Sequence, residues 1–135
     1  MISILIPCYD YNAYPLVLKL EKQALLLDVN FEIICCDDGS FSVKNENNQK
    51  INLLTNSKFI ELKKNIGRIK NRIFLANEAQ YDWLIFIDVD SDLKNNDYLK
   101  KYISKIGSSD FIFGGIEFKY NLNENFSLKN KFAKN

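Results

Sequence analysis

The sequence predicts an α/β fold with a mostly parallel sheet. Short apolar runs recur along the chain, and segments whose apolar residues have helical spacing lie between them. Such alternation of strand and helix is typical of parallel sheets. A further observation predicts a site, because two acidic clusters directly follow apolar runs: Asp37-Asp38-Gly39-Ser40 and Asp88-Val89-Asp90. Open α/β sheets bind ligands at the carboxyl ends of their strands, so we expect one site assembled from several loops.

Four apolar runs are expected to form strands, over Met1–Ile6, Phe31–Cys36, Lys58–Leu62 and Trp83–Ile87. We expect the first strand to stop at Pro7, because proline cannot donate the N–H of a ladder hydrogen bond. The turn Pro7-Cys8-Tyr9-Asp10 then brings a third loop to the same edge of the sheet. A further apolar run, Phe111–Phe113, breaks at Gly114-Gly115.

Three segments are expected to form helices. Asn12 can cap the first, which has Pro15 in its first turn and a buried stripe of Val17, Leu20, Ala24 and Leu27. The second follows the third strand, and its expected buried stripe is Ile66, Ile69, Ile73 and Ala76. The third can be capped by Asn95 or Asn96 and contains Tyr98, Tyr102 and Ile106. The polar stretch Ser40–Lys50 is only weakly helical.

Length and charge limit the class of protein. A chain of 135 residues fits one domain and should bury roughly two-thirds of its unfolded surface. The near balance of 18 Lys and Arg against 17 Asp and Glu provides no basic footprint, so we expect no nucleic-acid partner. No apolar stretch approaches the ~18 residues of a membrane span, and the apolar start lacks the features of a signal peptide. We therefore expect a soluble, cytoplasmic protein.

The residue types that are absent limit the chemistry. With no histidine, the chain has no imidazole general base, no Ser-His-Asp triad and no imidazole metal ligand. Any chemistry must therefore use carboxylates, and a metal held by oxygen would be Mg²⁺ or Mn²⁺. Cys8, Cys35 and Cys36 lack C-x-x-C spacing, and neighbours on a strand point to opposite faces. Buried thiols in a reducing compartment are expected.

Each acidic cluster has a functional and a structural interpretation. Asp88-Val89-Asp90 can aim two carboxylates at one hard cation that clamps a diphosphate, whereas Asp90, Ser91 and Asp92 could merely cap the next segment. Its position after a buried strand favours the metal. A carboxylate of Asp37-Asp38-Gly39-Ser40 can accept a hydrogen bond from a base or ribose, although Asp-Gly is also common in ordinary turns.

The basic residues Arg68, Lys70 and Arg72 lie near the start of the second predicted helix, where cations oppose the helix dipole. A need for positive charge beside a phosphate explains them, and a solvated surface explains them equally well.

In order and spacing, the elements from Met1 to about Phe118 resemble the nucleotide-binding half of a family 2 glycosyltransferase of the GT-A fold. The motifs that carry the resemblance are Pro7-Cys8-Tyr9, Asp37-Asp38-Gly39-Ser40, Asn65-Ile66-Gly67 with Arg72, and Asp88-Val89-Asp90. The resemblance implies a Rossmann-like sandwich with helices on both faces of the sheet. It also implies transfer of a sugar from a nucleoside-diphosphate sugar, with a UDP-sugar favoured, to an acceptor hydroxyl with inversion.

The resemblance assigns roles to particular residues. The backbone at Pro7 and the side chain of Asp38 would contact the base, Asp37 would support that turn, and Arg72 would lie near the phosphates. The implied nucleotide-binding set is Pro7, Tyr9, Asp37, Asp38, Arg72 and Asp88. The implied Mn²⁺ or Mg²⁺ ligands are Asp90 and Asp88. Nothing in the pattern identifies a catalytic base.

The resemblance also divides the chain. Residues 1–120 would form the nucleotide-sugar-binding domain, and residues 121–135 a polar tail or the start of an acceptor half. That half would bind an acceptor saccharide or lipid-linked saccharide, so the chain is expected to be a fragment of the GT-A fold. The helix after Gly67 departs from the usual family pattern, because Arg68, Ile69, Lys70 and Asn71 stand where small residues are usual.

The sequence leaves three alternatives open. Asp88 and Asp90 also resemble the nucleophile and acid-base pair of haloacid dehalogenase-like phosphatases, although Ser91-Asp92 replaces the usual Gly-Thr. A nucleotide-binding module without transfer activity is the second alternative. The third concerns association, because a sheet edge near Phe111 to Tyr120 could pair with another copy or a partner chain.

Overall fold

The computed structural model describes residues 1–112 and 114. In chain order its elements are β1 (Ile2–Cys8), α1 (Tyr14–Leu25), β2 (Phe31–Asp37), α2 (Asn45–Asn48), the 3₁₀ helix η1 (Gln49–Leu53), β3 (Ser57–Glu61), α3 (Arg68–Glu78), β4 (Trp83–Phe86) and α4 (Tyr98–Ile103). The described strands form one sheet in the order β3-β2-β1-β4, and every pair is parallel. The predicted parallel α/β sheet is therefore confirmed.

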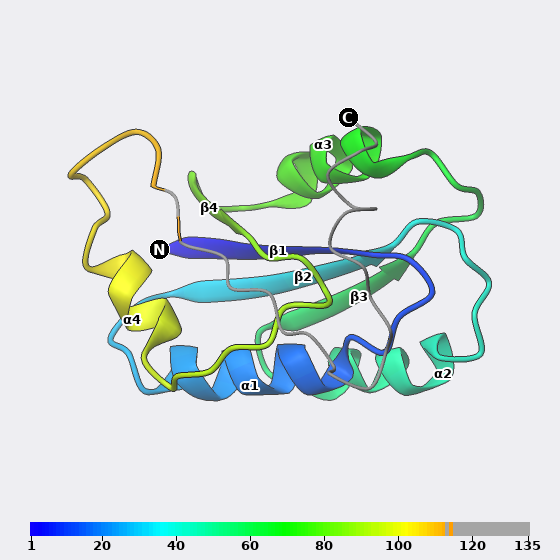
Figure 1. Cartoon of the computed structure of the whole chain (residues 1–135), viewed down its shortest axis with the longest axis horizontal. Helices are drawn as coiled ribbons and strands as arrows, with labels where there is room; N and C mark the ends of the chain where they lie inside the picture. Colours follow the sequence, from blue (N-terminus) through cyan, green and yellow to red (C-terminus); the bar gives the residue numbers. More distant parts are fainter. Residues whose placement is uncertain (113, 115–135) are drawn as a thin grey trace, which may run out of the picture.

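Helices cover both faces of this sheet (Figure 1). On one face α1 packs with η1 and α4 over the larger core, in which Val17, Leu20 and Ala24 are buried as predicted. On the other face α3 covers a smaller core around Leu5 and Leu75. Burial of apolar surface contributes about 25 cal/mol per Å², so the α1 face makes the larger contribution to stability.

β1 continues through Pro7 to Cys8, so the predicted end of this strand was wrong. The carbonyl of Leu5 accepts the N–H of Ile87 (3.0 Å), which shows that its backbone groups face β4. Pro7, two residues further on, faces the same way, but the last β1–β4 pair is Leu5 with Phe86. Because β4 ends before Pro7, the missing N–H of proline costs no hydrogen bond to β4.

The start of α1 is held by a distant side chain and not by Asn12. Asn48 is fully buried, and its Oδ1 accepts the backbone N–H groups of Ala13 (2.8 Å) and Tyr14 (3.3 Å). Asn12 instead accepts a hydrogen bond from Asn47 at the surface. The predicted cap was wrong because the real one comes from α2, thirty-five residues along the chain from Ala13.

α4 is held in the same way. The Oε1 of Gln23 on α1 accepts the N–H of Leu99 (3.1 Å), and its Nε2 donates to the carbonyl of Asn95 (3.1 Å). The helix itself begins after Asp97, whose side chain makes no capping bond. The predicted caps Asn95 and Asn96 are therefore replaced by a buried glutamine of the neighbouring helix.

α3 buries a different face from the one predicted. Ile69 and Ile73 are 76% and 55% exposed, whereas Asn71 and Leu75 are buried against the sheet. The side chain of Asn71 donates to the carbonyl of Cys36 (3.1 Å) and so fixes the rotation of the helix. The expected stripe failed because this helix carries apolar residues on two faces, and a polar contact selects between them.

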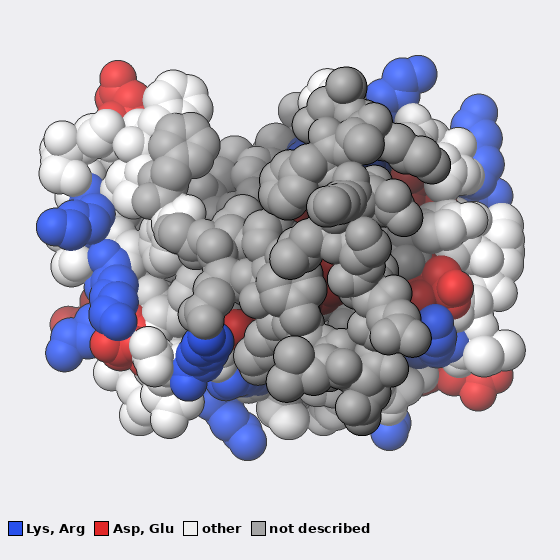
Figure 2. Space-filling view, in the orientation of Figure 1, with Lys and Arg blue, Asp and Glu red and all other residues white. Residues whose placement is uncertain are grey.

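Several other expectations can be compared with the described residues. Cys8, Cys35 and Cys36 are free and buried, with Cys35 and Cys36 in opposite cores. Within residues 1–112 and 114, no helix has the length and apolarity that a membrane crossing needs. Figure 2 shows positive and negative side chains interspersed around the margin of one face. The edge predicted near Phe111 to Tyr120 lies largely outside the described residues.

Candidate functional site

The loops that follow the four strands meet at one edge of the sheet, because all described strand pairs are parallel. β1 runs from the N-terminus on the left of Figure 1 toward this edge. Hydrogen bonds tie the loops to one another. The N–H of Asp38, after β2, donates to the carbonyl of Cys8 at the end of β1 (2.9 Å). The predicted common rim is therefore present.

Asp37 closes the turn that follows β2. Its two carboxylate oxygens accept the hydroxyl of Ser40 (2.6 Å) and the N–H of Ser40 (2.9 Å), and the residue is 1% exposed. Gly39 adopts φ 66°, and a Cβ there would lie 2.3 Å from the backbone carbon of Lys64. Only glycine fits both the left-handed conformation and this close approach. The turn is therefore closely packed against the loop after β3.

Asp38 binds the start of α3. Its Oδ1 accepts the N–H of Ile66 (2.7 Å) and its Oδ2 the N–H of Gly67 (2.9 Å), and the residue is only 5% exposed. Carboxylate acceptors at a helix start satisfy donors that have no partner within the helix. Two lone-pair positions of the carboxylate remain, so contact with a nucleotide base stays a prediction. Its structural role was not foreseen.

The second acidic cluster forms a tight turn. The N–H of Ser91 donates to the carbonyl of Asp88 (2.9 Å), which places Asp88 and Asp90 at the first and third positions. Both residues are exposed. The carboxylate of Asp88 pairs with the guanidinium of Arg72 across 2.5 Å between Oδ1 and Nη2. A pairing within the site was not part of the sequence prediction.

α3 therefore connects the two acidic clusters. Asp38 holds the N–H groups of Ile66 and Gly67 just before its first residue, and Arg72 on its second turn reaches Asp88. The buried contact of Asn71 with β2 lies between these two ends. The short distance in sequence between Gly67, just before α3, and Arg72 on α3 thus connects the loop after β2 to the loop after β4.

Sequence reasoning missed a second connection at the rim. Asp10, in the loop after β1, accepts the hydroxyl of Ser42 (2.7 Å) and pairs with Lys44 (3.2 Å) from the loop after β2. The hydroxyl of Ser42 and then the ammonium of Lys44 lower the pKa of Asp10 below its ordinary value. The signal available in the sequence was the polarity of Ser40–Lys50, which we interpreted as weak helix only.

The thiols under the rim have shifted pKa values. Burial raises the pKa of Cys36 to about 12, with the charges of Asp38 and Asp37 acting in the same direction. A hydrogen bond from Cys35 lowers the pKa of Cys8, whose thiol also donates to the carbonyl of Tyr11 (3.5 Å). The thiols are buried beneath the rim, and the exposed carboxylates form its polar surface.

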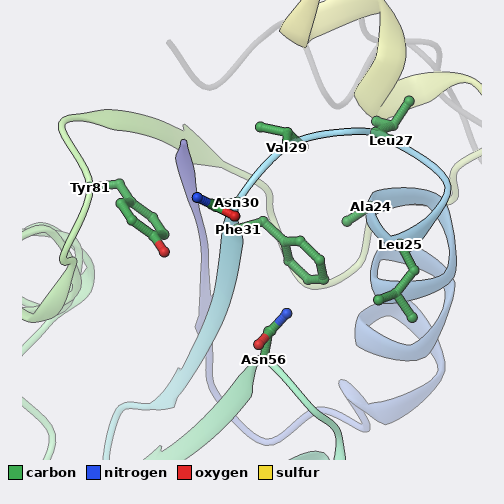
Figure 3. A pocket seen from close by; sticks show the side chains of 8 residues that line it. All are labelled: Ala24, Leu25, Leu27, Val29, Asn30, Phe31, Asn56 and Tyr81. Carbon is green, nitrogen blue, oxygen red and sulfur yellow. The ribbon is translucent and has the colours of Figure 1, made fainter.

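Two open hollows lie at the opposite end of the sheet. The first encloses about 260 Å³ and is lined by residues such as Phe31, Asn56 and Tyr81, which lie at or just before the starts of the strands (Figure 3). The second, of about 280 Å³, shares these three residues. Neither contains a residue of the acidic clusters, and ligands of open α/β sheets bind at the carboxyl ends. The rim is therefore the better candidate for the site.

Within residues 1–112 and 114, no group of three or more His, Cys, Asp or Glu side chains gathers as a complete metal site. Asp88 and Asp90 are the pair available at the rim. Two carboxylates with room for further oxygen ligands suit Mg²⁺ or Mn²⁺, which commonly take their remaining ligands from water and substrate phosphates. The residues present fit a cation that takes its other ligands from water or from a phosphate-bearing ligand.

The model of the family described as "Glycosyl transferase family 2" matches residues 3–133. The chain belongs to this family. The family predicted from Pro7-Cys8-Tyr9, Asp37-Asp38-Gly39-Ser40 and Asp88-Val89-Asp90 is therefore confirmed. A comparison with curated proteins found no match.

Solved structures agree with this family 2 assignment and with the GT-A fold. TarS 1–349 from S. aureus is 25% identical with a TM-score of 0.59, covering 79% of this chain and 32% of that chain. The same protein was also solved in complex with UDP-GlcNAc, at the same identity and TM-score, covering 79% and 31%. A mannosyltransferase from Pyrobaculum calidifontis, in complex with GDP-Man and Mn²⁺, is 14% identical with a TM-score of 0.61, covering 76% and 31%.

This family 2 chain spans about a third of the length of TarS 1–349. The structure places all seven residues of the predicted site on or beside the rim: Pro7, Tyr9, Asp37, Asp38, Arg72, Asp88 and Asp90. It joins Arg72 to Asp88 directly and Asp38 to the start of α3. Tyr9 is 58% exposed and Pro7 is half-buried, so both are accessible from the rim.

Proposed function

We propose that this chain provides the nucleotide-sugar site of a glycosyltransferase that moves a sugar from a nucleoside-diphosphate sugar to an acceptor hydroxyl with inversion. The observation that carries the proposal is the connection of both acidic clusters through α3 at the carboxyl edge of the sheet. Family membership supports the reaction class. A UDP-sugar is favoured, because TarS, solved with UDP-GlcNAc, is 25% identical to this chain.

In this proposal the base lies between the loops after β1 and β2. The backbone at Pro7 and the exposed ring of Tyr9 supply one wall, and the remaining lone pairs of Asp38 accept a base N–H. Asp37 contributes by closing its turn through Ser40. Because the carboxylate of Asp38 is already fixed by two backbone donors, it costs little entropy to present it to a nucleotide.

The diphosphate lies toward the loop after β4. Asp90 and Asp88 are the proposed ligands of Mn²⁺ or Mg²⁺, and Arg72 is the proposed cationic contact of the phosphates. A bound divalent cation supplies neutralisation of the charge that develops on the leaving diphosphate. A guanidinium complements this effect, because its donors match the spacing of phosphate oxygens.

The transfer itself forms a bond between the acceptor oxygen and the anomeric carbon and breaks the bond to the diphosphate. The acceptor proton passes to a base that we do not assign within this chain. We propose that the acceptor is a saccharide or a lipid-linked saccharide, bound by a region beyond the nucleotide-sugar domain of residues 1–120.

Thermal denaturation with UDP and with GDP, each with and without Mn²⁺, tests the proposal. Ligand at a hundredfold excess over its dissociation constant adds roughly 2.7 kcal/mol of stability and raises the midpoint by several degrees. We expect a Mn²⁺-dependent increase with UDP. Asp90→Ala should abolish it without changing the stability of the free protein, because Asp90 is exposed and makes no bond within the described residues.

Asp82→Ala is the matched control. Asp82 is an exposed aspartate at the amino end of β4, so the substitution removes the same charge away from the rim. It should leave the nucleotide shift intact. No shift with either nucleotide, or a shift that Asp82→Ala and Asp90→Ala reduce equally, contradicts the proposal. Cleavage of a generic phosphate monoester would then favour the haloacid dehalogenase-like alternative.

A further inference from the structure

The Arg72–Asp88 pair places a permanent cation on one of the two carboxylates that the proposed function gives to a metal. The Arg72 side chain is 32% exposed and that of Asp88 is 58% exposed, so solvent reaches both. Within the described residues, Arg72 is the one side chain that pairs with the Asp88 carboxylate. A metal ion that binds the Asp88 carboxylate must therefore displace the guanidinium of Arg72.

A guanidinium and a divalent cation compete for the same carboxylate oxygens. Both are positive, and Coulomb repulsion between them grows as they approach one ligand. The guanidinium has a second suitable partner, however, because its planar donors bind phosphate as well as carboxylate. A diphosphate at the rim would therefore offer Arg72 a replacement for Asp88.

α3 keeps this exchange local. The two residues before its start, Ile66 and Gly67, are fixed by the carboxylate of Asp38, and its buried face is fixed by the bond from Asn71 to Cys36. Because the helix is held at both points, a change of partner by Arg72 needs only a rotation of its long side chain. A movement of the helix is not required.

We propose that Arg72 is a positioning residue that holds Asp88 before the nucleotide arrives and passes to the diphosphate when the metal takes Asp88. This inference rests on the proposed function and adds a coupling to it. The nucleotide frees Asp88 for the metal by binding Arg72, and the metal frees Arg72 for the nucleotide. Thermodynamic linkage makes the two effects equal, so metal and nucleoside diphosphate bind with positive cooperativity.

The size of the effect follows from the exposure of the pair. Exposed ion pairs change an equilibrium by about 1.5- to 5-fold, and solvent screens both partners here. In the absence of nucleotide, Arg72→Gln should therefore bind Mn²⁺ about two- to fivefold more tightly than the unchanged protein. The cooperativity factor between Mn²⁺ and UDP should fall by at least as much, because the glutamine at position 72 pairs with neither Asp88 nor the diphosphate.

Titration of Mn²⁺, followed by the electron paramagnetic resonance signal of the free ion, measures both quantities on the full chain with and without UDP. Arg68→Gln is the matched control. Arg68 is an exposed arginine on the first turn of the same helix, so it reports the general effect of removing a charge. Arg72→Lys keeps the charge and should restore most of the competition for Asp88.

Of the three variants, only Arg72→Gln is expected to bind Mn²⁺ more tightly than the unchanged protein. Arg68→Gln and Arg72→Lys should bind Mn²⁺ about as tightly as the unchanged protein. Unchanged or weaker Mn²⁺ binding by Arg72→Gln without nucleotide overturns the inference, as does Mn²⁺ binding by none of the variants. If the Mn²⁺ affinity of Arg72→Gln is unchanged without UDP and rises on adding UDP as it does for the unchanged protein, the exchange of Arg72 is overturned and the proposed function stands. Absence of any effect of UDP contradicts the proposed function itself.

Discussion

Replacing Asp38 with alanine should destabilise the fold through the start of α3. The carboxylate is 5% exposed and accepts two backbone N–H groups, at 2.7 Å from Ile66 and 2.9 Å from Gly67. Its removal leaves both donors without their partner, and no residue of the helix can replace it.

The magnitude follows from these two bonds. A hydrogen bond to a charged group contributes about 1.5–3 kcal/mol, which gives an upper range of about 3–6 kcal/mol for the two. Ile66 and Gly67 are half-buried, so water can satisfy part of the loss once the side chain is shortened. We therefore expect a decrease of about 2–4 kcal/mol in the free energy of unfolding. Asp38→Asn, which keeps one acceptor oxygen, should lose about half as much.

Urea unfolding followed by the fluorescence of Trp83, the one tryptophan of the chain, measures this decrease. Asp90→Ala is the control, because that exposed carboxylate makes no bond within the described residues and its loss should change stability by less than about 0.5 kcal/mol. Amide exchange at Ile66 and Gly67 should accelerate in Asp38→Ala. Equal stabilities of the two variants, with unchanged exchange at these amides, would refute the assigned role of Asp38.

Two more predictions concern buried groups. Asn48→Ala should lower the free energy of unfolding by about 2–4 kcal/mol, because the buried amide accepts hydrogen bonds from the N–H groups of Ala13 and Tyr14 and donates one to the carbonyl of Tyr11. A loss under about 1 kcal/mol in urea unfolding would contradict this role of Asn48. The pKa of Cys36 is raised from 9.0 to about 12, so the unfolded chain releases this proton first as the pH rises. The free energy of unfolding should therefore fall by about 1.4 kcal/mol per pH unit between these two pKa values. Urea unfolding from about pH 8 to about pH 11 measures this slope, and Cys36→Ala should remove it. Equal slopes for the variant and the unchanged protein would contradict the raised pKa of Cys36.

The sheet could be predicted from sequence because its signals are local. Each strand is a short apolar run, and the acidic residues that follow, Asp37 and Asp88, mark the ends of two of them. Parallel pairing then brings these ends to one edge whatever the details of the loops. Strand ends were predicted less accurately, and Pro7 shows why, since its tolerance depends on where the neighbouring β4 ends.

The contacts that fix the helices could not be predicted, because they join residues far apart in the chain. Asn48 and Gln23 each hold the start of another helix, and nothing in their own neighbourhood indicates it. The buried face of α3 depends on Asn71, which reaches Cys36 thirty-five residues earlier. The same holds for the site, where the pairing of Arg72 with Asp88 follows from the position of the helix.

A paramagnetic metal ion can locate the proposed metal-nucleotide site on the protein. Amide resonances of the full chain, recorded with UDP and increasing Mn²⁺, broaden according to their distance from the paramagnetic ion. With the metal at Asp88 and Asp90, the amides of Val89 and Asp90 should broaden first, those of Gly39 and Gly67 next, and those of Asn56 and Tyr81 at the opposite end of the sheet last. Broadening centred on Asn56 and Tyr81, or spread evenly over the chain, would contradict a metal-nucleotide site at the carboxyl edge.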